Sequence, residues 1–161
     1  MRGGRSGAGL AAVAGLVLAA AAGCGSGGSP TEAITSAAAW APPPRYAFTL
    51  YSSCGERWLI GRFGVTVVNG EVSAVEGLDE PARLAVKDRD LKFLREVVPT
   101  LSGMAAEAAN ARANGADVVE VTVDKTDGHL TRVDIDPAKN AIDDESCYTI
   151  TDYRVLTGTP T

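Results

Sequence analysis

The alternation of apolar and polar side chains constrains the fold of this chain more than any other feature. In residues 46–51 and 57–68 the large apolar side chains recur at every second position. Successive side chains of a β-strand point to opposite faces, so this spacing predicts two half-buried strands. Asn69-Gly70 follows and favours a type I′ turn, in which both central residues take positive φ. Residues 71–75 are therefore expected to return as a third strand.

The middle of the chain changes to helical spacing. Leucine and valine side chains between residues 84 and 98 predict one helix, which Pro81 bounds near its start and Pro99 at its end. Thr100 is the expected N-cap of a second helix over residues 101–114, and Gly115 offers its C-terminal stop. The expected core-facing stripe of this second helix is Leu101, Met104, Ala105, Ala108 and Ala109.

Strand-like alternation returns in residues 119–123, 131–135 and 147–155, with Asp127-Gly128 as the turn between the first two. The chain order is then three strands, two helices and three strands. An antiparallel sheet of about six strands with helices packed on one face is the economical way to bury these apolar faces, so we predict an α+β fold. The domain is expected to cover residues 45–161. The order of the strands in the sheet stays open.

The first 44 residues have a different character. Arg2 and Arg5 precede an uncharged apolar run over residues 10–22, as in an export signal. This run is shorter than the roughly 20 residues that a membrane-spanning helix needs. We therefore expect residues 1–23 to be a signal peptide.

Small residues precede the first cysteine. Ala21-Ala22-Gly23-Cys24 resembles the lipobox of bacterial lipoproteins, although the commonest form of that motif begins with Leu. The motif predicts cleavage before Cys24 and attachment of acyl chains such as palmitate, which would anchor the protein to the extracytoplasmic face of the cell membrane. Residues 24–44, rich in Gly, Ser, Ala and Pro, are then a flexible tether. The alternative is an ordinary secretory signal with an unrelated cysteine.

The chain has three cysteines. If Cys24 carries lipid, Cys54 and Cys147 remain as a pair, and an oxidising compartment favours a disulfide between them. Such a bond would close a loop of about 90 residues and stabilise the fold by on the order of 4 kcal/mol. The alternative is two separate buried thiols.

The charge balance limits the class of partner. The full chain has 15 basic and 20 acidic residues, and loss of Arg2 and Arg5 with the signal leaves 13 basic residues and a net charge of −7. An acidic domain is a poor match to nucleic acid or to an anionic membrane surface. The expected contacts are therefore the bilayer through the lipid on Cys24, and an unidentified envelope protein or ligand.

Several separated blocks of the sequence resemble one bacterial family, the lipoproteins grouped as domain of unknown function 6174. The family usually carries Pro after its Asp-Gly-His turn, where this chain has Leu130. The family has no assigned activity, so the resemblance implies architecture and compartment but no functional residue. The matching blocks, which fall within residues 46–153, are Tyr46-Ala-Phe-Thr-Leu, Ser53-Cys54-Gly55-Glu56-Arg57, Gly115-Ala116-Asp117-Val118, Asp127-Gly128-His129 and Asn140-Ala-Ile-Asp-Asp-Glu-Ser-Cys147-Tyr-Thr-Ile.

Candidate catalytic residues are few. His129 is the only histidine in the chain, which excludes a multi-histidine metal site, and the expected pairing of the cysteines disfavours a thiolate zinc site. Its position beside Asp127 and Gly128 favours a structural role in a turn. We therefore predict no catalytic residue, no cofactor and a non-enzymatic binding or accessory module. The alternative is a small hydrolase using His129 with nearby acids, although no Gly-x-Ser-x-Gly elbow supports it.

Carboxylates gather near the C-terminus. Ca²⁺ takes six to eight oxygen ligands, which such a cluster and loop carbonyls could supply. The spacing does not match an EF-hand loop, however, so a solvated acidic surface is preferred and no metal site is predicted. The cluster is Asp134, Asp136, Asp143, Asp144 and Glu145, and the last four are the candidates for a calcium-binding surface.

Four aromatic residues are the candidates for binding a partner. The outer face of an antiparallel sheet is a natural surface for protein recognition, and aromatic side chains are enriched at interfaces. Core packing is the alternative role for some of them. The four residues are Tyr51, Trp58, Tyr148 and Tyr153.

Overall fold

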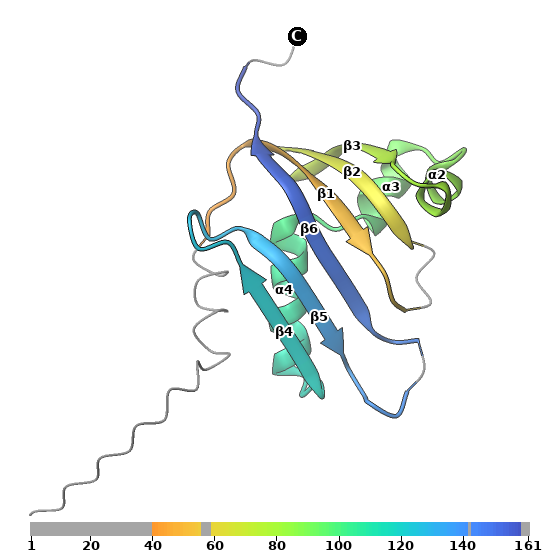
Figure 1. Ribbon diagram of the computed structural model, residues 1–161, viewed down its shortest axis with the longest axis vertical. Helices are drawn as coiled ribbons and strands as arrows, with labels where there is room; N and C mark the ends of the chain where they lie inside the picture. Colours follow the sequence, from red (N-terminus) through yellow and green to blue (C-terminus); the bar gives the residue numbers. More distant parts are fainter. Residues whose placement is uncertain (1–39, 56–58, 142, 159–161) are drawn as a thin grey trace, which may run out of the picture.

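The computed structural model describes residues 40–55, 59–141 and 143–158. In this part of the chain six strands form one sheet, in which every neighbouring pair is antiparallel (Figure 1). The α+β class and the six-stranded antiparallel sheet are thus confirmed. The strands are β1 (Arg45–Ser52), β2 (Gly61–Val68), β3 (Glu71–Gly77), β4 (Val118–Val123), β5 (Leu130–Asp136) and β6 (Ser146–Val155).

The sheet consists of two three-stranded halves. Its strand order is β3-β2-β1-β6-β5-β4, so each half is a run of hairpins and the halves meet where β1 pairs with β6. Asn69 and Gly70, between β2 and β3, have φ values of 52° and 84°, as predicted for the Asn-Gly turn. The second strand begins at Gly61, later than expected. Two residues of its predicted start, 57 and 58, lie outside the described part of the chain.

Three helices connect the two halves: α2 (Glu80–Val86), α3 (Leu91–Val97) and α4 (Leu101–Ala113). The prediction of one continuous helix between Pro81 and Pro99 is therefore wrong, because two short helices, α2 and α3, take its place. In the described residues, no helix is long and apolar enough to cross a membrane.

Each of the two short helices has its own N-cap, and the backbone between them cannot continue a helix. Asp79 and Asp90 are N-caps, and their Oδ1 atoms accept hydrogen bonds from the N–H groups of Ala82 at 3.0 Å and Phe93 at 2.8 Å. Between the two helices Asp88 has a φ of 58°. An L-residue cannot keep this left-handed conformation within a right-handed helix, so α2 ends and α3 has to begin anew.

The longest helix, α4, follows its prediction closely. The hydroxyl oxygen of Thr100 caps it by accepting a hydrogen bond from the Gly103 N–H at 3.0 Å. Gly115 takes a φ of 77° just after its end. Leu101, Met104 and Ala108 are buried, whereas Ala109, which was expected on the same stripe, is exposed.

The hydrophobic core lies between the sheet and the helices. Figure 1 shows α4 behind β4, β5 and β6, and α2 and α3 near β2 and β3, in agreement with the contacts between these elements. Buried side chains of the sheet alternate most clearly along β2 and the first half of β6, as expected of a half-buried antiparallel sheet. The largest buried side chains of the sheet are Tyr46, Phe48, Leu50, Phe63 and Tyr148, and the helices with the C-cap residue of α3 add Ala82, Val98, Leu101, Met104 and Ala108.

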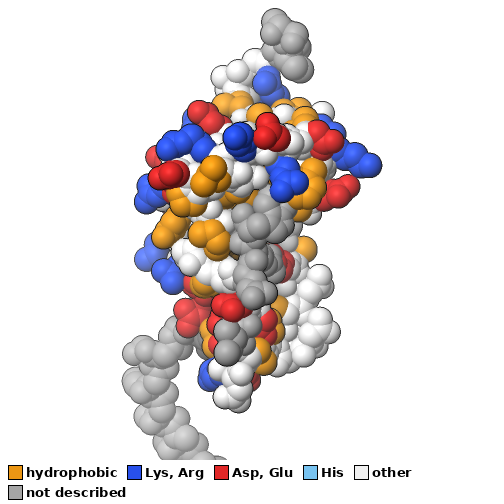
Figure 2. All heavy atoms as spheres, turned by 90° about the vertical axis from the view of Figure 1, so that its right-hand side faces the viewer, with side chains coloured by type: hydrophobic (Ala, Val, Ile, Leu, Met, Phe, Trp, Pro, Cys, Tyr) orange, Lys and Arg blue, Asp and Glu red, His pale blue; other side chains and the backbone are white. Residues whose placement is uncertain are grey.

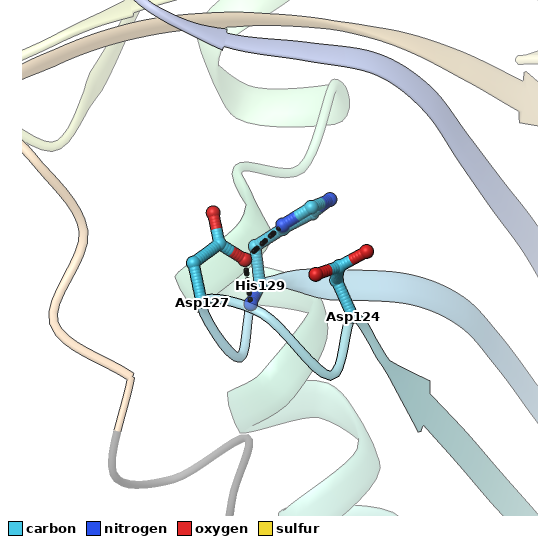
Figure 3. A group of neighbouring side chains, drawn as sticks. All are labelled: Asp124, Asp127 and His129. Carbon is cyan, nitrogen blue, oxygen red and sulfur yellow. Dashed lines mark hydrogen bonds and ion pairs between the residues drawn. The ribbon is translucent and has the colours of Figure 1, made fainter.

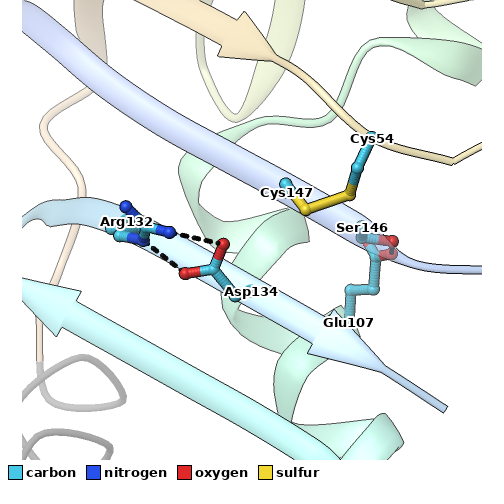
Figure 4. Close-up of a disulfide and its surroundings, with 6 residues drawn as sticks. All are labelled: Cys54, Glu107, Arg132, Asp134, Ser146 and Cys147. Carbon is cyan, nitrogen blue, oxygen red and sulfur yellow. Dashed lines mark hydrogen bonds and ion pairs between the residues drawn. A yellow bond between two sulfur atoms is a disulfide. The ribbon is translucent and has the colours of Figure 1, made fainter. Parts of the chain in front are cut away.

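A disulfide joins Cys54 to Cys147, which confirms the predicted pairing over that of two separate thiols. The bond links the segment just after β1 to the beginning of β6 (Figure 4). The two cysteines are 93 residues apart in the sequence. Because one lies next to β1 and the other in β6, the bond connects the two halves of the sheet covalently.

The N-terminal regions are described only from residue 40 onward. The expected signal peptide, Cys24 and most of the expected tether thus lie outside the described residues. Trp40, near the end of that tether, contacts the domain: its ring lies 6.0 Å from the rings of both Tyr46 and Tyr153, edge to face. Packing on the domain therefore begins before β1.

Candidate functional site

The loop between β4 and β5 brings three potential metal-ligating side chains together. Asp124 directly follows β4, and Asp127 and His129 precede β5. The Asp124 N–H donates to the His129 carbonyl at 2.8 Å, and Gly128, with a φ of 81°, donates its N–H to the Asp124 carbonyl at 3.0 Å. These two hydrogen bonds close the loop, so that the side chains of Asp124, Asp127 and His129 lie close together (Figure 3).

The two aspartates lie on either side of His129 (Figure 3). His129 Nδ1 contacts Asp127 Oδ1 at 2.5 Å, and this oxygen also accepts the His129 backbone N–H at 3.1 Å. Asp124 Oδ1 accepts the Thr126 N–H at 2.7 Å. One potential ligand atom of each of the three residues lies within 4.8 Å of the other two. In chemical terms this is a carboxylate–imidazole–carboxylate group at the tip of a hairpin.

Tyr153 holds the histidine ring in place. The two rings are stacked, with centroids 4.1 Å apart and an interplanar angle of 20°. Asp152 has a φ of 52° and lies where the pairing of β1 with β6 shifts register. This bulge breaks the alternation of β6 and turns Tyr153 toward Tyr46 and Trp40. The side chain of His129 is only 13% exposed as a result of this packing.

The electrostatics of the loop are negative. The pKa of Asp124 is lowered, mainly because its carboxylate accepts a hydrogen bond from the Thr126 backbone N–H. The pKa of Tyr153 is raised, first by burial and then by the negative charge of Asp127. The larger cause of each shift is local, namely a backbone hydrogen bond at Asp124 and burial at Tyr153, and the exposed Lys125 lies between the two aspartates.

The sequence pointed to only part of this group. His129 and Asp127 were noticed together, but as turn residues, and Asp124 was missed. The spacing Asp-x-x-Asp-x-His was the available signal. It becomes informative only when the two strands are known to pair, because the hairpin brings the end of β4 back to the start of β5.

The candidate calcium ligands are placed elsewhere. Asp136 ends β5, and Asp143, Asp144 and Glu145 lie in the loop that leads to β6. None of them belongs to the group of Asp124, Asp127 and His129, which is the group of potential metal ligands found among the described residues. Asp134, the remaining member of the acidic cluster, forms a two-point ion pair with Arg132 on the same strand (Figure 4).

The four aromatic candidates are not brought together on one surface. Tyr51 is 40% exposed and lies beneath the guanidinium of Arg62, 5.4 Å from its ring centroid. Tyr148 is 1% exposed and pairs with the buried Ser52, so it is on the opposite, covered face. Tyr153 is half-buried against His129, and Trp58 lies outside the described residues. Among the described candidates, only Tyr51 offers much surface to a partner.

A pocket of about 450 Å³ lies between the helices and β3, next to Tyr148. Glu107 of α4 lines it and lies beside Ser146 (Figure 4), whose Oγ donates to Glu107 at 2.9 Å. The Tyr148 hydroxyl also donates to the Glu107 carboxylate, at 3.4 Å. Arg95, also lining the pocket, donates from Nε to the Val72 carbonyl at 2.8 Å. Sequence reasoning missed Glu107, since a single acid on a helix flank carries no distinctive pattern.

One side of the molecule has a surface of mixed charge. Figure 2 views the molecule from the right-hand side of Figure 1 and shows Lys and Arg side chains interspersed with Asp and Glu over its upper part. No patch of one sign covers that part of this side. The arrangement fits the poor match to nucleic acid that the overall charge predicts.

The fold and the site define an α+β protein with a disulfide-linked antiparallel sheet and an Asp–Asp–His group in its β4–β5 hairpin. The chain belongs to a family of unknown function (DUF6174), whose family model matches residues 37–155. The resemblance of separated sequence blocks is thereby confirmed at the level of the family. No curated protein and no solved structure matches the chain.

Proposed function

We propose that this protein is a lipid-anchored, extracytoplasmic lipoprotein that acts as a non-enzymatic binding or accessory module. One observation carries the proposal: the disulfide uses Cys54 and Cys147, so of the three cysteines Cys24 is left over. This is the cysteine that follows the lipobox-like Ala21-Ala22-Gly23. A disulfide is also typical of proteins in oxidising compartments outside the cytoplasm.

The open face of the sheet is the proposed binding surface, and its partner is another envelope protein. We take all three helices to pack on the other face, in keeping with the composition of the core. Tyr51 and Arg62 stack on the open face. Nearby, Gly64 lacks a side chain and borders a shallow groove of about 210 Å³ beside Leu78, which is 43% exposed. Exposed Tyr, Arg and Leu side chains around a groove fit a protein partner.

The anchor is tested by the intact mass of the protein purified from its native membrane, before and after reduction and alkylation. The expected mass is that of a chain beginning at Cys24 with added acyl groups. The protein should take up alkylating reagent only after reduction, at two cysteines. A mass without lipid would contradict the anchor, and alkylation without reduction would contradict the disulfide.

The binding surface is tested by a photo-crosslinking amino acid placed at Tyr51 in the full-length protein in its native membrane. Leu84 of α2 is the matched control, because it is 66% exposed and lies on a helix rather than on the sheet. A reproducible adduct of one mass should form from position 51 and not from position 84. No adduct at position 51, or the same adducts at both positions, would contradict this surface.

The hydrolase alternative would use His129 and Asp127, whose side chains are in contact. A His–Asp pair can orient an imidazole as a general base. Screening the protein against ester, amide and glycoside substrates tests this alternative. An activity that His129→Ala abolishes while the fold is retained would replace the binding-module proposal.

A further inference from the structure

The loop between β4 and β5 has the composition and geometry of an open metal site. We propose that Asp124, Asp127 and His129 bind one divalent transition-metal cation of the Zn²⁺ type. The proposal goes beyond the binding-module function and does not depend on it. It rests on three side chains of two ligand types whose ligand atoms converge within 4.8 Å (Figure 3).

The distances are close to those around a bound ion. Bonds from Zn²⁺ to imidazole nitrogen and carboxylate oxygen are about 2.0–2.2 Å long, so ligand atoms around one ion lie up to about 4 Å apart. The three ligand atoms lie within 4.8 Å of one another, and an ion bound among them would replace the 2.5 Å contact between His129 Nδ1 and Asp127 Oδ1 with bonds from these groups to the metal. The backbone of the loop can stay fixed, because the bonds of Asp124 to His129 and Gly128 close the loop independently of the side chains.

The histidine is already oriented for binding. Stacking on Tyr153, with ring centroids 4.1 Å apart, holds the imidazole ring in one position. A metal-ligating histidine needs such support from its surroundings, because a ring that is fixed in advance loses little freedom on binding. The side chain of Asp127 is 44% exposed, so the group can be reached from solvent.

Charge also favours a cation. Asp124 and Asp127 are acidic side chains whose carboxylate oxygens lie within 4.8 Å of the imidazole, so a divalent cation between them would offset the repulsion of the two carboxylates.

The ligand set distinguishes the class of metal. Ca²⁺ takes six to eight oxygen ligands, and imidazole is not among its usual partners. Imidazole suits Zn²⁺ and its transition-metal neighbours, which also accept carboxylates. Three protein ligands leave one position of a tetrahedral Zn²⁺ for water. The group therefore fits Zn²⁺ better than the calcium that the acidic loop near the C-terminus suggested.

The test uses the protein purified from cells that express the full-length chain, in detergent and without an affinity tag, titrated with ZnCl₂ or CaCl₂ and followed by calorimetry. The variants are Asp124→Asn and His129→Gln. Asp143→Asn is the matched control, because Asp143 is an exposed acid of the other loop and its φ of 67° is one that Asn tolerates. We expect one equivalent of Zn²⁺ to bind at least tenfold more tightly than Ca²⁺. Asp124→Asn and His129→Gln should weaken Zn²⁺ binding at least tenfold, and Asp143→Asn should leave it unchanged.

A second readout does not depend on any variant. Because the chain has one histidine, the imidazole nitrogen resonances in an NMR spectrum of the wild-type protein belong to His129. Stoichiometric Zn²⁺ should shift them strongly. Absence of binding up to about 1 mM Zn²⁺, unshifted imidazole resonances, or equal weakening by Asp143→Asn would each overturn the proposal.

Discussion

Tyr153 shows how one side chain can hold a loop to a sheet. It contacts His129 of the β4–β5 loop, Tyr46 of β1 and Trp40 before β1. These neighbours belong to three separate segments of the chain, and aromatic pairs add to the energy of simple burial. Removal of the ring should therefore loosen the end of the sheet where all three segments meet.

We expect Tyr153→Ala to lower the free energy of unfolding by about 2 kcal/mol or more, because a half-buried aromatic ring and its ring contacts are lost. Urea denaturation followed by circular dichroism measures the change. Tyr51→Ala is the control and should cost less than about 0.5 kcal/mol, because Tyr51 is exposed. Equal losses in the two variants would contradict the role given to Tyr153.

Asp124 predicts a dependence of stability on pH. Its pKa is lowered in the folded protein by the Thr126 backbone N–H. A carboxyl whose folded pKa lies below its unfolded value of about 3.9 stabilises the fold above that value, and the contribution is lost as the pH falls through the folded pKa. Urea midpoints measured from pH 6 down to pH 3 should fall less steeply in Asp124→Asn than in the wild type. Parallel curves would show that this carboxyl does not contribute.

At the scale of the elements, a glycine decides how closely β3 and α2 can approach. A Cβ atom at Gly77 would overlap the backbone of Ala82 and Arg83 in α2. A Cβ atom at Gly64, in the neighbouring strand, would have its nearest neighbour at 3.6 Å, an ordinary contact. The packing of the short helix α2 on the sheet therefore depends on a residue without a side chain.

Gly77→Ala should destabilise the protein by about 1–3 kcal/mol, because backbone atoms have to move to make room. Gly64→Ala is the matched control in the same sheet and should change stability by less than about 0.5 kcal/mol. Thermal unfolding of both variants under identical conditions compares them. A more stable Gly77→Ala protein would mean that α2 is not packed tightly on β3.

The sequence predicted the individual strands and helices better than it predicted which of them pair or pack together. Each strand was indicated by its own alternation, and α4 by Thr100, its apolar stripe and Gly115, because these signals are local. The division between α2 and α3 was missed because it depends on the backbone of Asp88. The order of the strands was left open, because alternation along a strand does not identify its neighbour. Only the predicted pairing of Cys54 with Cys147 indicated that the end of β1 lies near the start of β6.

The candidate site shows the same limit. Tyr153 was expected on an exposed face, but the bulge at Asp152 turns it inward. Tyr148 was named as a partner-binding residue and is buried, because alternation along β6 does not tell which face is covered. Asp124 joined the group of Asp127 and His129 only through the hairpin that pairs β4 with β5.

For the whole molecule, the disulfide is the strongest link between its halves. Replacing both Cys54 and Cys147 with Ala should lower the free energy of unfolding by on the order of 4 kcal/mol, because the unfolded chain is then no longer constrained. Urea denaturation of the oxidised wild type and the double variant measures the difference. The reduced wild type is the control and should unfold near the double variant. Equal stability of oxidised and reduced protein would contradict the prediction.

The pairing of β1 with β6 also determines which features of the domain lie at each end of the sheet. The Leu156 N–H donates to the Arg45 carbonyl at 3.0 Å, so the chain enters β1 and leaves β6 at the same end of the sheet. Trp40, Tyr153 and His129 lie at that end, and the disulfide lies at the other. The two ends of the sheet therefore differ in chemistry, and reduction of the Cys54–Cys147 bond would act at the end opposite to the Asp–Asp–His group.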